Sequence, residues 1–276
     1  MSGHVLDFYM YTYAGPTVHV EPMLRFMSHI CRLGAATGLP IGICWNDTPR
    51  DVRYSPRSWE RFLTRVRDGV VQTCLVVQFA RPGMTMLSFS GSTLSPFSMD
   101  AFFVPAGGIP PDTRNSAFQL ARARKTDRYP SALHLKLDTG AFQGLVDRGL
   151  QELLAEFDDL VTAAAAACAC VEAGVMHPDF GTLPSGPELL DDRTLLENLD
   201  RRIPGIFWRL YLGPQHIARL GGKGHVLRTF ADCRILGLSS GEEDRVCIQL
   251  TENIGALDDE VANRHRPLFR SVLEKE

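Results

Sequence analysis

The residues best suited to acid–base chemistry are a histidine and an aspartate two positions apart in a stretch rich in proline and glycine. His177 and Asp179 flank Pro178, and such a pair could move a proton during hydrolysis. The sequence supplies no nucleophile elbow, no HExxH pattern and no Walker A loop to accompany them. A hydrolase that uses His177 and Asp179 is therefore one alternative, and we expect instead a protein that is not an enzyme.

Other residues with chemical potential are also better explained by structure. His134 alternates with Lys136 and Asp138, a spacing more typical of the polar face of a sheet than of a general base. Cys168 and Cys170 share one face of a strand, but no nearby Cys/His cluster completes a set of four metal ligands. We expect no metal site and no cofactor. The segment 221–224, Gly-Gly-Lys-Gly, lacks the spacing of a phosphate-binding loop and predicts a turn.

Carboxylates gather in two stretches near the C-terminus. Residues 186–200 hold five acids and one base, and residues 240–260 hold seven acids and one base. Such groups often form only a hydrated surface; alternatively, they form an acidic rim that attracts a basic partner. The candidate partner-binding acids are Asp191, Asp192, Glu197, Glu242, Glu243 and Asp244.

The segment 205–212 alternates in the manner of a strand and is rich in aromatic residues. In a strand, Phe207, Arg209 and Tyr211 would share one face, and Ile206, Trp208 and Leu210 would share the other. Aromatic residues beside an arginine are typical anchors of protein interfaces. Phe207, Arg209 and Tyr211 are therefore further candidates for partner binding, with packing in the core as the alternative.

The charge of the 276-residue chain is unevenly distributed. Residues 1–130 carry 14 Lys/Arg and 9 Asp/Glu, whereas residues 131–276 carry 15 and 23, for a net charge of −3. This division suits a protein with an acidic face for a cationic partner, although chance clustering would also produce it. The basic tract 122–125 lacks interleaved aromatic residues, so we expect no direct contact with nucleic acid.

The cysteines and the N-terminus predict a cytoplasmic location. The seven cysteines are odd in number and lie mostly in apolar runs, which is typical of buried thiols in a reducing compartment. The first residues lack the pattern of a signal peptide, and no apolar run is long enough to span a membrane.

The order of expected elements predicts an α+β fold with two mainly antiparallel sheet modules, each covered by helices. The first module is expected at 1–104, a linker rich in proline and glycine at 105–130, and the second module at 131–276. Helices are expected to begin at Glu21–Pro22, at Ser55–Pro56 and near Ala141. The expected strands are 5–12, 41–45, 73–80, 85–90, 99–104, 132–138, 205–212, 226–237 and 245–251.

The C-terminal third carries a resemblance to a known family. The run 203–214, Ile-Pro-Gly-Ile-Phe-Trp-Arg-Leu-Tyr-Leu-Gly-Pro, is followed by Ile-Ala-Arg-Leu-Gly at 217–221. Together they resemble type VI secretion immunity proteins, of the Immunity protein 52 family or the sister type VI immunity domain. The resemblance covers residues 200–276 and carries over no catalytic or binding positions.

The resemblance implies a protein that binds and neutralises a cognate toxin in the cytoplasm. The implied partner is a restriction-endonuclease-like DNase delivered by type VI secretion, whose active site the immunity protein would occlude. An adaptor that loads an effector onto the secretion machinery is a further alternative.

Overall fold

The computed structural model describes residues 4–46, 52–81, 84, 95–109, 128–138, 143–166, 168–175, 197–237, 245–253 and 256–273. The strands are β1 (His4–Thr12), β2 (Ile41–Trp45), β3 (Val52–Arg53), β4 (Thr73–Gln78), β5 (Phe97–Phe102), β6 (Ser131–Asp138), β7 (Cys168–Val175), β8 (Arg209–Leu212), β9 (Arg234–Gly237) and β10 (Val246–Gln249). The helices are α1 (Pro16–Ala35), α2 (Pro56–Arg67), α4 (Gln143–Ala163), α7 (Pro214–Arg219), α8 (Lys223–Thr229), α9 (Asp259–His265), the 3-10 turn η3 (Arg266–Phe269) and α10 (Arg270–Leu273).

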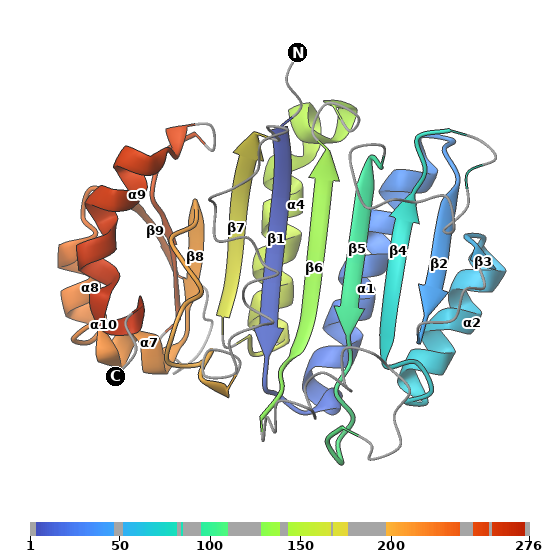
Figure 1. The fold of residues 1–276 in the computed structure, drawn as a ribbon, viewed down its shortest axis with the longest axis horizontal. Coiled ribbons are helices and arrows are strands. Elements are labelled where there is room, and N and C mark those ends of the chain that lie inside the picture. The colour runs from blue at the N-terminus through green and yellow to red at the C-terminus, as the bar shows by residue number, and fades with distance from the viewer. Residues whose placement is uncertain are drawn as a thin grey trace.

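The strands of the described residues form one ten-stranded sheet in the order β3-β2-β4-β5-β6-β1-β7-β8-β10-β9 (Figure 1). Each neighbouring pair is antiparallel. The predicted α+β class is confirmed. The expected two sheet modules are instead one continuous sheet, because β1 of the expected first module lies between β6 and β7 of the expected second module. The division at 105–130 stays a prediction, and residues 110–127 of it lie outside the described residues.

One face of the sheet is covered by α1, α2 and α4, which form the helix-side core with it (Figure 1). Alternate residues of the strands point to this face, as the pleat requires. Phe157 of α4 is fully buried there, with its ring centroid 5.0 Å from that of Phe8, 5.7 Å from that of Phe26 and 5.5 Å from that of Tyr211. These contacts join α4 to β1, α1 and β8.

The opposite face of the sheet is covered at the end formed by β8, β10 and β9. There α7, α8 and α10 form a second core, which we call the C-terminal core (Figure 1). Leu210 and Leu212 of β8 point into this core, together with Tyr9 and Tyr11 of β1. The sequence 203–221 that carries the family resemblance therefore forms a strand and a helix that pack together at this end of the sheet.

Gly34 allows α1 to lie close to the sheet. A Cβ atom at this position would lie 2.6 Å from Cε1 of Phe97, a side chain that is fully buried. The carbonyl of Gly34 also accepts a hydrogen bond from Nε2 of Gln78 in β4, at 2.7 Å. Only glycine fits this helix position without displacing the buried ring.

Some predicted boundaries are confirmed and others are wrong, and the strand expected at 85–90 lies outside the described residues. Ser55 caps α2 as expected, since its hydroxyl accepts the N–H of Ser58 at 3.1 Å. However, α1 begins at Pro16, and Pro22 lies inside the helix. The strand expected at 226–237 forms only at its end, as β9, because the turn at Gly221 and Gly222, with φ of 90° and 88°, starts the helix α8, which continues to Thr229.

Candidate functional site

Most of the predicted partner-binding acids lie outside the described residues. They are Asp191, Asp192, Glu242, Glu243 and Asp244, and His177 and Asp179 of the hydrolase alternative lie outside them too. Glu197 is described and is half-buried, two positions before the fully buried Leu199. The acidic rim therefore stays a prediction.

The three candidates in the aromatic segment are all buried in the structure. The exposed fractions are 1% for Phe207, 3% for Arg209 and 2% for Tyr211. They do not share a face either: Phe207 lies in the C-terminal core and Tyr211 in the helix-side core, together with Trp208. The expected alternation is wrong upstream of Arg209 because β8 begins only at that residue.

Arg209 is the centre of a buried polar network that joins β8 to α4 and β10. Its Nε donates to Oε1 of Gln249 at 2.9 Å, and its Nη1 lies 3.5 Å from Oδ1 of Asp158. The hydroxyl of Tyr211 donates to the same Asp158 oxygen at 2.7 Å. The guanidinium carbon of Arg209 also lies 5.3 Å from the ring centroid of Trp208. The alternative that these residues pack in the core is the one that the structure supports.

The pKa shifts in this network indicate a structural role rather than a catalytic one. Burial raises the pKa of Asp158, while the hydrogen bond from Tyr211 and the positive charge of Arg209 act in the opposite direction. Burial is also the largest reason that the pKa of Tyr211 lies well above its usual range. A buried cation that is paired and hydrogen-bonded in this way stabilises one arrangement of helix and sheet, and its removal or isolation is costly.

A second cluster lies on the sheet face opposite α1 and α4, across three central strands. His134 of β6 is flanked by Asp100, its register partner in β5, and by Asp7 of β1, which lies two residues from its register partner Tyr9. Its Nε2 lies 3.2 Å from Oδ1 of Asp7, and its Nδ1 lies 3.6 Å from Oδ2 of Asp100. The ring of Tyr9 stacks on the imidazole with the centroids 4.4 Å apart. The structure thus places His134 on a polar sheet face, as the sequence predicts.

The carboxylates of Asp7 and Asp100 determine the protonation state of His134. Burial acts to lower its pKa, but the contacts with Asp100 and Asp7 outweigh burial and raise the pKa to about 9. The imidazole is therefore protonated at neutral pH, and both ring nitrogens face a carboxylate. A protonated ring cannot accept another proton, so this cluster acts as an ion group that ties three strands together rather than as a general base.

We expect the contribution of His134 to stability to depend on pH. Its pKa is raised above the value of about 6.5 in an unfolded chain, so the stabilisation is fully present below pH 6.5 and is lost as the pH rises towards 9. Urea unfolding of the wild type and of His134→Gln should differ by about 1–2 kcal/mol at pH 6 and converge above pH 9. A difference that grows with pH would contradict the ion cluster.

The structure also pairs two residues that sequence spacing does not connect. Sγ of Cys233 lies 3.5 Å from Nε2 of His265, and Nδ1 of His265 donates to the carbonyl of Val261 at 2.8 Å. That bond leaves Nε2 as the acceptor for the thiol proton. Burial raises the pKa of the Cys233 thiol, which keeps it protonated and disfavours a nucleophilic thiolate. The pair fixes α9 against the end of β9, and no local motif could have revealed it.

The described residues show neither a cluster of metal ligands nor a membrane-spanning helix. Within these ranges, no three His, Cys, Asp or Glu side chains come together as metal ligands could. None of the helices placed by the structure has both the length and the apolar character needed to cross a membrane.

Comparison with known proteins identifies a fold but no family. No protein-family model matches the chain, and no curated protein matches it by sequence. A solved structure of the Pseudomonas aeruginosa T6SS protein PA0821 is similar, with a TM-score of 0.60 over 98% of this chain and 73% of that chain. The two sequences are 12% identical over the match, so the similarity establishes a shared α+β fold alone. Membership of the Immunity protein 52 family is not shown.

Proposed function

We propose that this chain is an immunity protein of a type VI secretion system that binds a cognate toxin and occludes its active site. The observation that carries the proposal is the fold shared with a T6SS protein over almost the whole chain. The family resemblance of residues 203–221 supports the same class, and this segment forms β8 and α7 in the structure.

The proposed toxin is a restriction-endonuclease-like DNase. A cleft that binds DNA must be electropositive, because it holds phosphates. The acid-rich stretches 186–200 and 240–260 supply charge of the opposite sign, which favours fast association and correct orientation. We therefore retain Asp191, Asp192, Glu197, Glu242, Glu243 and Asp244 as proposed contacts and omit the three buried residues Phe207, Arg209 and Tyr211.

The test is to express the effector encoded beside this protein's gene in sensitive cells, with and without this chain. We expect the chain to restore growth, to purify in a stable complex with the effector and to stop DNA cleavage by the purified effector. A variant of the effector without nuclease activity should bind equally well, which separates binding from toxicity.

Other outcomes would favour the alternatives. An adaptor would form the complex but leave DNA cleavage unchanged. A hydrolase would protect cells without a stoichiometric complex, and His177→Ala would abolish that protection. Absence of both a complex and protection would contradict the immunity function itself.

A further inference from the structure

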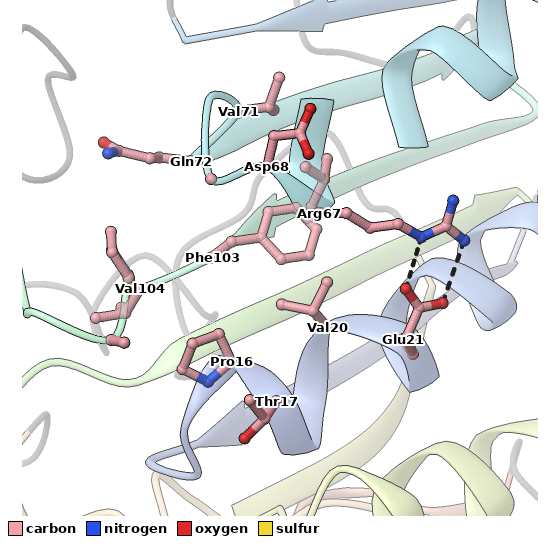
Figure 2. Close-up of a pocket in the computed structure, with 14 residues that line it drawn as sticks. Pro16, Thr17, Val20, Glu21, Arg67, Asp68, Val71, Gln72, Phe103 and Val104 are labelled. Atoms are coloured by element: carbon pink, nitrogen blue, oxygen red, sulfur yellow. Dashed lines mark hydrogen bonds and ion pairs between the residues drawn. The ribbon is translucent and has the colours of Figure 1, made fainter. Parts of the chain in front are cut away.

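A hollow of about 510 Å³ opens between α1, the end of α2 and the end of β5 (Figure 2). We call it the α1–α2 groove. The first two turns of α1 form one wall, and the turn from α2 into β4 forms the other. Phe103, directly after β5, contributes its aromatic ring. Its apolar lining includes Pro16, Val20, Val71, Phe103, Val104 and Ala106.

Two exposed apolar side chains neighbour lining residues along the chain without lining the groove themselves. Val18 is 41% exposed and lies in the first turn of α1, and Val70 is 54% exposed and lies between two residues that line the groove. Among the residues that the structure describes, the other large apolar side chains with comparable exposure are Leu227 and Leu268, at the C-terminal end of the fold. A concave apolar surface with exposed apolar neighbours marks a binding site more strongly than scattered exposed residues do.

The polar rim of the groove has an excess of negative charge. Arg67 donates to both carboxylate oxygens of Glu21, at 2.6 and 3.2 Å, and Figure 2 shows this pair beside the apolar lining. Arg67 also lies 3.8 Å from Glu60. The hydrogen bond from Arg67 holds the pKa of Glu21 below its usual value, so both partners are charged at neutral pH. Asp68 adds a further exposed carboxylate to the lining.

The positions of the charged residues indicate where the cationic side chain of a partner would lie in the groove. The groove is lined by two carboxylates, those of Glu21 and Asp68, and by one guanidinium, that of Arg67, which is bonded to Glu21, whereas Arg25 and Arg32 line a separate hollow that shares the Glu21–Arg67 pair. A cation of a partner would therefore lie at the Asp68 side. An apolar side chain of the same segment would fill the space over Val20, Val71 and Phe103.

We infer that the α1–α2 groove receives a segment of the toxin in which a bulky apolar side chain stands next to a lysine or arginine. This inference rests on the proposed function and names a contact that lies away from the acidic stretches 186–200 and 240–260. Apolar anchors in concave pockets carry most of the energy of many interfaces, and complementary charges at the rim fix their orientation. The volume lies within the range of about 300–1,000 Å³ that is typical of ligand pockets.

Two substitutions test the apolar and the charged part separately. Thr17→Trp places a large side chain at an exposed position of the lining, and Asp68→Lys reverses the rim charge. The matched controls are Leu227→Trp on α8 and Glu152→Lys on α4, which lie at exposed positions outside the groove and outside the two acid-rich stretches. Thermal unfolding should show that all four variants fold.

The probe is the nuclease-inactive form of the effector encoded beside this protein's gene, with Kd measured by titration calorimetry. We expect Thr17→Trp to weaken binding at least about 30-fold and Asp68→Lys about 5- to 10-fold, with the controls within about twofold of wild type. A photo-crosslinking residue at position 70 should attach to the effector, and one at position 227 should not.

The outcomes separate the two proposals. Wild-type affinity in Thr17→Trp and Asp68→Lys, without crosslinking at position 70, overturns the groove inference and leaves the immunity function intact. Crosslinking at position 70 supports the inference even where Thr17→Trp does not fold. A wild-type chain that neither binds the effector nor protects cells overturns both.

Discussion

Replacing Phe157 with alanine should lower the free energy of unfolding by about 4 kcal/mol. The side chain is fully buried, and its ring contacts those of Phe8, Phe26 and Tyr211 from three different elements. Alanine would leave a cavity where α4 meets β1, α1 and β8, and the surrounding rigid strands cannot close over it. Urea unfolding followed by circular dichroism measures the change.

Phe157→Leu is the matched control because it retains most of the apolar volume. We expect it to cost about 1–2 kcal/mol. A loss below about 1.5 kcal/mol for Phe157→Ala would mean that α4 contributes little to the helix-side core, and would contradict the packing described for this helix.

The second large effect is expected at the next residue of α4, where the mechanism is electrostatic. Asp158→Ala should lower the free energy of unfolding by about 3 kcal/mol, because it leaves the guanidinium of Arg209 buried without its counter-charge. The value lies at the low end of the range for broken buried pairs, since Asp158 is 26% exposed and Gln249 still accepts a bond from Arg209.

Neighbouring positions supply the controls. Asp159 is exposed, so Asp159→Ala should change stability by no more than about 0.5 kcal/mol. Tyr211→Phe removes one hydrogen bond to Asp158 and should cost about 1–2 kcal/mol. Asp158→Ala combined with Arg209→Met should cost clearly less than the sum of the two single changes. Additive losses would show that Arg209 and Asp158 are not coupled.

Short-range sequence patterns predicted a helix or strand correctly where a capping residue or a clear alternation of apolar and polar residues was present. The Ser55–Pro56 start gave α2, and the alternation after Ser131 gave β6, because capping and side-chain period act over a few residues. The start of α1 was wrong because two prolines stand six residues apart and each could open a helix. Gly15 and Pro16 open α1 in the structure, so Pro22 is an interior residue.

The polar clusters were predictable only in part. The sequence placed His134 on a polar face, but its partners Asp7 and Asp100 come from strands that only the sheet order brings together. Arg209 was expected at an interface because an arginine between aromatic residues is typical of one. Its burial depends on Asp158 and Gln249, and no spacing rule links these three positions along the chain.

The place of β1 in the sheet has a consequence for synthesis on the ribosome. Among the strands of this sheet, β1 is translated before the others, yet it pairs with β6 and β7, which begin only at Ser131 and Cys168. Both edges of β1 therefore stay unpaired until β6 and β7 have been translated. Strand pairings between residues so distant in sequence also form slowly. An unpaired strand edge promotes aggregation. We expect a nascent chain of this topology to need chaperones that bind it and prevent aggregation until β7 has been translated.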